Sequence, residues 1–309
     1  MAVARDPSAA RELVRRERLA LRISAVGGGV LAAVALIWGW LAGSGVILFD
    51  GVFAAAGIVL VSVSVLASHA ADAAPTARYP FGRHAATPMA VVIQGAALLA
   101  TMLYGLVDSV AVLVAGGSDG APLHLLAYGA VAAVGATVLA LLVRRSAPGS
   151  TLALAEVVSW RAGAWLSVVI AIGGGVGIAL QRSAYAGAAR YVDPVLLLVA
   201  VLLLAPAPVR LLRQGTHQLL EGAPDPAVAA AVDRAVAAVQ AQFDLPAPRV
   251  RGSQVGDRLY VEADFLVAPG RWTVDQEDAV RRAVIAGLDE LGLDVWATVD
   301  LTTDPGYDA

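Results

Sequence analysis

Six long apolar stretches are the feature of this 309-residue sequence that most constrains its fold. A helix needs about 20 mostly apolar residues to cross the hydrocarbon core of a bilayer, which is about 30 Å thick. Six stretches reach this length, and each predicts a membrane-spanning helix. They are approximately Leu21–Ala42, Val46–Ala67, Pro88–Val114, Leu123–Val143, Leu152–Leu180 and Val192–Leu212. Only 15% of the residues are charged, which is too few to cover a soluble protein of this size.

The distribution of charge divides the chain near residue 214. Residues 1–214 contain 15 Arg and nine Asp or Glu, a net charge of +6, whereas residues 215–309 contain seven Arg and 16 Asp or Glu, a net charge of −9. The apolar stretches end at the same place. We therefore predict three parts: an N-terminal tail (1–20), a six-span α-helical transmembrane domain (21–214) and a water-soluble α+β domain (215–309).

Arginine positions predict the orientation of the spans, because cytoplasmic loops of membrane proteins carry an excess of basic residues. Arginines gather in the N-terminal tail, after the second and fourth spans and at the end of the sixth. The loops 42–45 and 116–122 on the opposite side have none, and only Arg182 and Arg190, between spans five and six, break the bias. We expect a multi-pass integral protein of the bacterial inner membrane, in contact with lipid, with both termini in the cytoplasm.

Local patterns in residues 215–309 predict the element order α-β-β-α-β. Asp225-Pro226 resembles a helix start with proline at the first helical position, and Thr273 with Gln276 fits a capping box. Apolar and polar residues alternate along Leu259–Val267 with the period of a strand, after the turn residues Gly256-Asp257. The expected elements are a helix from Pro226 to about Phe243, strands Arg249–Val255 and Leu259–Val267, a helix from Thr273 to about Leu291, and a strand at about Val295–Leu301. They predict one sheet covered by one layer of helices.

Three short segments, together with this architecture, carry a resemblance to a known family. Ile47-Leu48-Phe49-Asp50-Gly51 is an apolar run that ends in an aspartate early in span two. Tyr79-Pro80-Phe81-Gly82-Arg83, followed by Pro88 and Gln94-Gly95, leads into span three, and Tyr191-Val192-Asp193-Pro194 opens span six. Over nearly the whole chain, the sequence resembles the cation diffusion facilitator (cation efflux) family, proton-coupled exporters of divalent metals. The resemblance implies a homodimer through the C-terminal domains and a divalent cation as substrate, with no resident cofactor.

The sequence departs from this family at the metal site. Family members carry an acid or His in span two and an Asp four residues later, with a matching pair in span five, so that four ligands converge on a tetrahedral ion. The positions in span five align with Ser159 and Gly163. In span two, two registers stay open: the pair falls on Asp50 and Ala54, or on Phe53 and Gly57 with Asp50 just before it. Either way at least three of the four ligands are lost, so the resemblance implies a degenerate metal site.

The loop before span three departs in the same way. The family's loop histidines fall on Tyr79 and Arg83, although His84 is adjacent. An arginine at a ligand position repels a cation. The usual histidines of the family's C-terminal domain are missing as well, which leaves Asp300, Thr302 and Asp304 near the last strand.

Polar residues inside the spans are the candidates for the transport pathway, because an ionisable side chain is costly in a membrane and is therefore a functional candidate by default. Asp50 is the candidate metal ligand or proton carrier, and the alternative is a solvated or capping residue near the interface. Asp108 lies toward the same side of the membrane, where an interfacial aspartate is favoured over a pair with Asp50. Ser159 occupies a ligand position. Arg161 either replaces the ion electrostatically or extends to the cytoplasmic interface. Asp193-Pro194 fits an N-cap of span six, and four tryptophans fit interfacial belts: Trp38, Trp40, Trp160 and Trp165.

Two functions remain after the exclusions. The chain has no cysteine, which excludes disulfides and thiol chemistry, and no nucleophile–base pair that would indicate an enzyme. The acidic C-terminal domain argues against a nucleic-acid partner. The first hypothesis is a divergent transporter that exchanges a cation for protons at Asp50. The alternative is a non-transporting relative that serves as a membrane scaffold or sensor.

Overall fold

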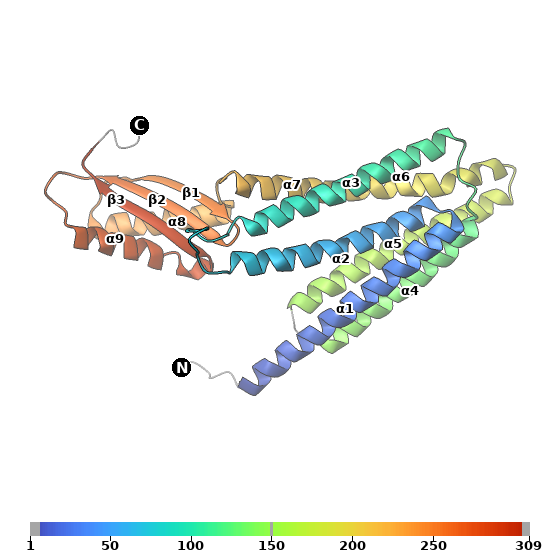
Figure 1. The fold of residues 1–309 in the computed structure, drawn as a ribbon, viewed down its shortest axis with the longest axis horizontal. Coiled ribbons are helices and arrows are strands. Elements are labelled where there is room, and N and C mark those ends of the chain that lie inside the picture. The colour runs from blue at the N-terminus through green and yellow to red at the C-terminus, as the bar shows by residue number, and fades with distance from the viewer. Residues whose placement is uncertain (1–6, 149–150, 305–309) are drawn as a thin grey trace. The chain divides into compact units, whose positions relative to one another are not determined.

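The computed structural model describes residues 7–148 and 151–304. Figure 1 shows long helices over the first two thirds of the chain and a sheet with helices near the C-terminus. The chain forms two compact units, Met1–Ser62 with Ala96–Val209, and Val63–Gly95 with Arg210–Ala309. The domain limits expected at residues 20 and 214 stay predictions.

Six helical segments within the described residues are long and apolar enough to cross a membrane, and together they contain all six predicted stretches. They are α1 (Pro7–Ala42), α2 (Gly45–Ala71), α3 (Ala86–Val114), α4 (Pro122–Ser146), α5 (Thr151–Gln181) and a sixth that joins η1 (Ala186–Tyr191), α6 (Val192–Leu204) and α7 (Pro206–Leu219). The sixth segment is interrupted at Ala205, because Pro206 cannot continue the backbone hydrogen bonds of α6. The six-span fold class is thus confirmed.

Small residues allow the helices of the first unit to approach closely. A side-chain carbon added at Gly174 on α5 would lie 2.2 Å from the backbone nitrogen of Leu126 on α4, and one added at Gly129 on α4 would lie 2.4 Å from the backbone nitrogen of Ala171 on α5. Such contacts are typical of helices that pack inside a membrane. The glycine-rich run at 173–175 therefore serves at least in part for helix packing.

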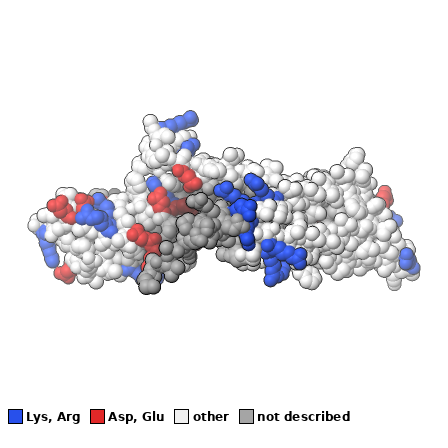
Figure 2. Space-filling model, turned by 90° about the horizontal axis from the view of Figure 1, so that it is seen from below, with Lys and Arg blue, Asp and Glu red and all other residues white. Residues whose placement is uncertain are grey.

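The outer surface of these helices is apolar, as a lipid environment requires. Side chains such as Leu41, Leu103, Val114 and Leu203 are more than half exposed. On the face drawn in Figure 2, the part formed by the spanning helices is mostly uncharged, and basic and acidic side chains are mixed on the C-terminal part.

The C-terminal elements follow the predicted order. They are α8 (Pro226–Phe243), β1 (Arg249–Val255), β2 (Arg258–Leu266), α9 (Val274–Ala286), η2 (Asp289–Leu291) and β3 (Asp294–Thr302). Strand β2 lies in the centre of the sheet, antiparallel to β1 and parallel to β3. The capping box of Thr273 and Gln276 is present at the start of α9. The helix expected to reach Leu291 ends at Ala286 and is followed by the short turn η2.

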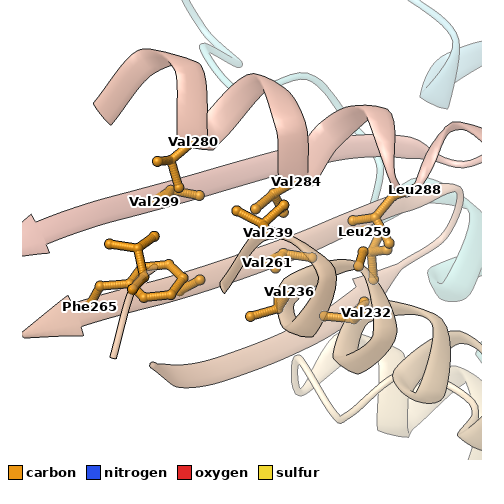
Figure 3. Packing of buried hydrophobic residues seen from close by; sticks show 13 residues of the cluster. Val232, Val236, Val239, Leu259, Val261, Phe265, Val280, Val284, Leu288 and Val299 are labelled. Atoms are coloured by element: carbon orange, nitrogen blue, oxygen red, sulfur yellow. The ribbon is translucent and has the colours of Figure 1, made fainter. Parts of the chain in front are cut away.

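Helices α8 and α9 pack on the face of the sheet that the alternation in β2 predicted (Figure 3). Leu259, Val261, Ala263 and Phe265 are all buried, at no more than 2% exposure. They pack against buried valines of α8 and α9 and a leucine just after α9: Val232, Val236, Val239, Val280, Val284 and Leu288. One sheet covered by one helical layer is therefore confirmed.

The loop between α2 and α3 contacts the C-terminal sheet within the second unit. The Phe81 and Trp296 rings meet edge to face at 6.0 Å, and Arg258 donates a hydrogen bond of 3.4 Å to the Phe81 carbonyl. In the β1–β2 turn, Gly256 has φ +61°, and a side-chain carbon there would lie 2.8 Å from the His84 carbonyl oxygen. The family-like loop motif thus includes a docking point for the sheet, which the sequence pattern did not predict.

Candidate cation site

A cavity of about 640 Å³ lies between α1, α2, α4 and α5, entirely within the first unit. Small and aliphatic side chains form most of its wall. Its polar lining residues are two carboxylates, Asp50 and Glu156, with Tyr128, Trp160 and four serines: Ser24, Ser62, Ser159 and Ser167. The described lining residues include no Arg, Lys or His, so the cavity has acidic groups without a basic neighbour in its wall.

Asp50 marks one end of this cavity. It lies on the second turn of α2, and the Tyr128 hydroxyl on α4 donates a hydrogen bond to its carboxylate. Tyr128 is 3% exposed, and the Trp38 ring packs edge to face against it at 6.0 Å. Trp38 in turn donates a hydrogen bond of 3.3 Å to His124, one helical turn before Tyr128. Asp50 is therefore held by a tyrosine whose ring is itself packed against Trp38.

Glu156 marks the other end. It lies near the start of α5, and the buried Ser24 hydroxyl on α1 donates a hydrogen bond to its carboxylate. Trp160, one turn further along α5, donates a hydrogen bond of 2.8 Å to the same Ser24 oxygen. Ser24 thus connects the acid and the indole of α5 to α1, and the short polar chain satisfies groups that lipid cannot solvate.

Helix geometry gives the distance between the two ends. Gly129, next to Tyr128 on α4, lies against Ser167 and Ala171 of α5, so the Asp50–Tyr128 pair is level with this part of α5. Glu156 lies 11 residues before Ser167 on the same helix. At about 1.5 Å of rise per residue, the two carboxylates are roughly 16 Å apart along the bundle. The cavity is therefore elongated, with one acid toward each end.

The family's ligand positions converge on this cavity. Asp50, Ala54, Ser159 and Gly163 all line it, which is the full set in the first of the two registers. In the other register Gly57 lines the cavity, but Phe53 packs in the core with its ring stacked on Phe49 at 6.1 Å. Within residues 7–148 and 151–304, no group of three or more His, Asp or Glu side chains is placed to hold a metal ion.

Two of the predicted pathway residues lie outside this cavity. Arg161 does not line it and is exposed on α5. Asp108, on α3, lines a separate cavity of about 250 Å³ that also contains Asp193 and Ser109. Asp50 and Asp108 are therefore not brought together, and the partner that the structure gives to Asp50 is Tyr128.

Asp193 connects α6 to the start of α2. Its carboxylate accepts hydrogen bonds from the Ser44 hydroxyl at 2.5 Å and from the backbone nitrogens of Gly45 at 2.9 Å and Val46 at 3.4 Å. Nearby, the Ser109 hydroxyl donates to the Pro194 carbonyl at 2.7 Å. The expected N-cap of span six was wrong: Asp193 lies inside α6, which begins at Val192, and its carboxylate instead caps the N-terminus of α2.

The loop positions where the family has histidines form a different structure. The Arg83 guanidinium lies over the Tyr79 ring at 5.5 Å, and Arg78 lies over the same ring at 5.7 Å. Tyr79 also pairs with Thr76 in a short backbone bridge. Cation–π contacts between side chains of the loop thus take the place that the resemblance gives to metal ligands.

Comparison with known families agrees with this geometry. A family model described as the cation efflux transmembrane domain matches residues 21–220, well over half of the chain. Comparison with curated protein sequences finds no match. The match defines a multi-pass membrane transport protein and not an enzyme. The chain belongs to the cation efflux, or cation diffusion facilitator, family.

Several residues of the site were missed from sequence. The sequence does not single out Tyr128 or Ser24, because a single hydroxyl in an apolar stretch gives no periodic signal. The interfacial assignment of the four tryptophans stays a prediction: Trp40 and Trp165 are 75% and 73% exposed, Trp160 donates to Ser24 in the cavity wall, and Trp38 donates to the exposed His124. A polar residue within a span was the one signal that could have identified Tyr128.

The Asp193 cap gives a prediction about stability. Changing Asp193→Ala leaves the buried Ser44 hydroxyl and the first amides of α2 without their acceptor, which typically costs about 1–3 kcal/mol. We expect a lower midpoint in thermal unfolding of the detergent-solubilised protein. Asp193→Asn keeps one acceptor oxygen and should lose less, and Asp119→Ala, at an exposed loop position, should not change the midpoint. An unchanged midpoint for Asp193→Ala would show that the cap is unimportant.

Proposed function

We propose that the protein is a cation transporter that exchanges a cation for protons at Asp50, with both termini in the cytoplasm. The observation that carries the proposal is the convergence of Asp50, Ala54, Ser159 and Gly163 on one cavity between four spanning helices. A carboxylate in such a place binds either a proton or a cation. Occupation by one therefore displaces the other, which is the basis of exchange.

The support around Asp50 suits this role. Tyr128 donates to the carboxylate, yet the two carboxylate oxygens together offer about four acceptor sites. The acid can therefore keep this bond while it takes up a proton or a cation. Trp38 limits the movement of the Tyr128 ring through its edge-to-face contact, so the carboxylate stays directed at the cavity in both states.

We further propose that the metal site of the family is degenerate in this chain. In the first register, which the cavity lining supports, three of the four positions are Ala54, Ser159 and Gly163. A tetrahedral site for zinc needs four ligands, or three and a water. One carboxylate and one hydroxyl would hold a divalent ion weakly, so the ancestral metal is a poor candidate for the present substrate.

The resemblance also supports a homodimer formed through the C-terminal domains. Light scattering from the purified full chain in detergent, corrected for bound detergent, would give twice the mass of one chain. A monomeric mass would contradict the proposed dimer without affecting the site.

Neutralising Asp50 should abolish exchange. For Asp50→Asn in proteoliposomes, we expect cation-driven proton flux, measured with an internal pH-sensitive dye, to fall to the level of protein-free liposomes. The amide retains the shape of the carboxylate but cannot bind a cation or carry the exchanged proton. Asp72→Asn, at an exposed acid in the loop after α2, is the matched control and should transport as the parent does.

Transport by Asp50→Asn at the parent rate would remove Asp50 from the mechanism. If the parent itself drives no flux with any inorganic or organic cation, the result favours the alternative function, a non-transporting membrane scaffold or sensor. The observation that favours this alternative is the absence of metal-binding side chains at three of the four ligand positions in the first register.

Restoring the ligand positions should restore metal binding. The triple variant Ala54→Asp, Ser159→His, Gly163→Asp supplies three ligands beside Asp50, and a side chain at Gly163 meets no neighbouring atom within 4 Å. We expect saturable Zn²⁺ binding by calorimetry for the triple variant and none for the parent. Equal zinc affinity of the parent and the variant would show that the parent site is not degenerate.

A further inference from the structure

The wall of the α1–α2–α4–α5 cavity is a poor environment for a bare metal ion. A small divalent ion loses its water shell only where several oxygen, nitrogen or sulfur ligands replace it. The two carboxylates are roughly 16 Å apart by helix rise, whereas a single ion contacts its ligands at about 2 Å. Between the acids, the wall is formed largely by alanine, glycine and aliphatic side chains. No single ion can use both carboxylates.

The size of the cavity fits a larger molecule. Its volume of about 640 Å³ lies inside the range of about 300–1,000 Å³ that is usual for sites of organic ligands. Apolar walls with a few fixed polar groups are also usual for such sites. The space therefore accommodates an organic body rather than a single ion.

The charges and rings select a cation among organic molecules. Asp50 and Glu156 supply two negative groups, and no described lining residue is basic. Tyr128 and Trp160 also line the cavity, and aromatic faces attract organic cations. Both rings are fixed by hydrogen bonds: Tyr128 donates to Asp50, and Trp160 donates to Ser24. An aromatic group thus lies beside each acid.

We infer that this cavity binds an amphipathic organic monocation, such as a quaternary ammonium or phosphonium with alkyl or aromatic groups. Its apolar body occupies the space between the helices, and its charge is attracted by both carboxylates. The inference rests on the proposed function, because it names the substrate class of that same exchange site. Weak hydration makes such a cation cheaper to transfer from water than a metal ion.

Direct binding of tetraphenylphosphonium tests this inference. Equilibrium dialysis with the radiolabelled probe and the purified full-length protein in lipid nanodiscs should show saturable binding. An excess of ZnCl₂ should not displace the probe. Triphenylphosphine oxide, which is similar in shape but neutral, should compete poorly.

Two glycines on α5 provide a matched pair of steric variants. A side chain at either Gly163 or Gly175 meets nothing within 4 Å, but only Gly163 lines the cavity. Gly163→Leu should weaken tetraphenylphosphonium binding by about tenfold or more, the usual effect of extra methylenes in a filled pocket. Gly175→Leu should bind as the parent does.

Glu156→Gln provides a second variant that keeps the cavity shape. It should weaken binding by about fivefold or more, because unit charges within roughly 16 Å still attract each other in a protein interior. Competition by the neutral triphenylphosphine oxide should show no such dependence on Glu156. Size-exclusion profiles identical to the parent establish that each variant is folded.

The outcomes separate this inference from the proposed function. Absence of saturable tetraphenylphosphonium binding, or parent-like binding by both Gly163→Leu and Glu156→Gln, overturns the inference, while Asp50-dependent flux of an inorganic cation would leave the exchange proposal intact. Binding with the expected dependence on Gly163 and Glu156 supports the inference. If such binding occurs but neither an organic nor an inorganic cation drives Asp50-dependent proton flux, the inference stands and the exchange mechanism is wrong.

Discussion

The hydrogen bond from Tyr128 to Asp50 is the interaction on which the candidate cation site depends. Lipid offers no partners to a carboxylate, so an acid inside the bundle persists only where the protein holds it. Here the phenol on α4 holds an acid on α2, and Trp38 on α1 supports the phenol. Three helices are thereby joined at one end of the cavity by the group that we propose to exchange a proton for a cation.

The same constraint explains the other polar contacts of the spans. Ser24 satisfies Glu156 and Trp160 together, and Asp193 satisfies the first amides of α2. Each contact joins two helices. Such a hydrogen bond fixes the relative position of the two helices more closely than apolar packing between alanine and valine surfaces does. The acids differ in their partners: Asp193 accepts three hydrogen bonds from the start of α2, whereas Asp50 and Glu156 each accept one from a side chain and line the larger cavity.

The fold was predictable because its signals are local. Apolar length defined the spans, and the alternation along Leu259–Val267 defined the buried face of the sheet. The site was only partly predictable. Asp50 and Ser159 line the cavity as the resemblance suggested, but the Tyr128 contact with Asp50 joins residues 78 positions apart. Asp193 was misread for the same reason, since an Asp-Pro helix start gives no sign of an acceptor role toward another helix.

The proposed transport requires that the α1–α2–α4–α5 cavity admit a cation from water. The chain contains no cysteine, so Ala54→Cys creates a single thiol in the cavity wall, and Phe53→Cys places one in the neighbouring core as a control. A cationic methanethiosulfonate reagent applied to proteoliposomes should label Cys at position 54 and not at position 53, and tetraphenylphosphonium should slow the labelling. Failure to label position 54, or equal labelling of both positions, would contradict the entry of a cation into this cavity.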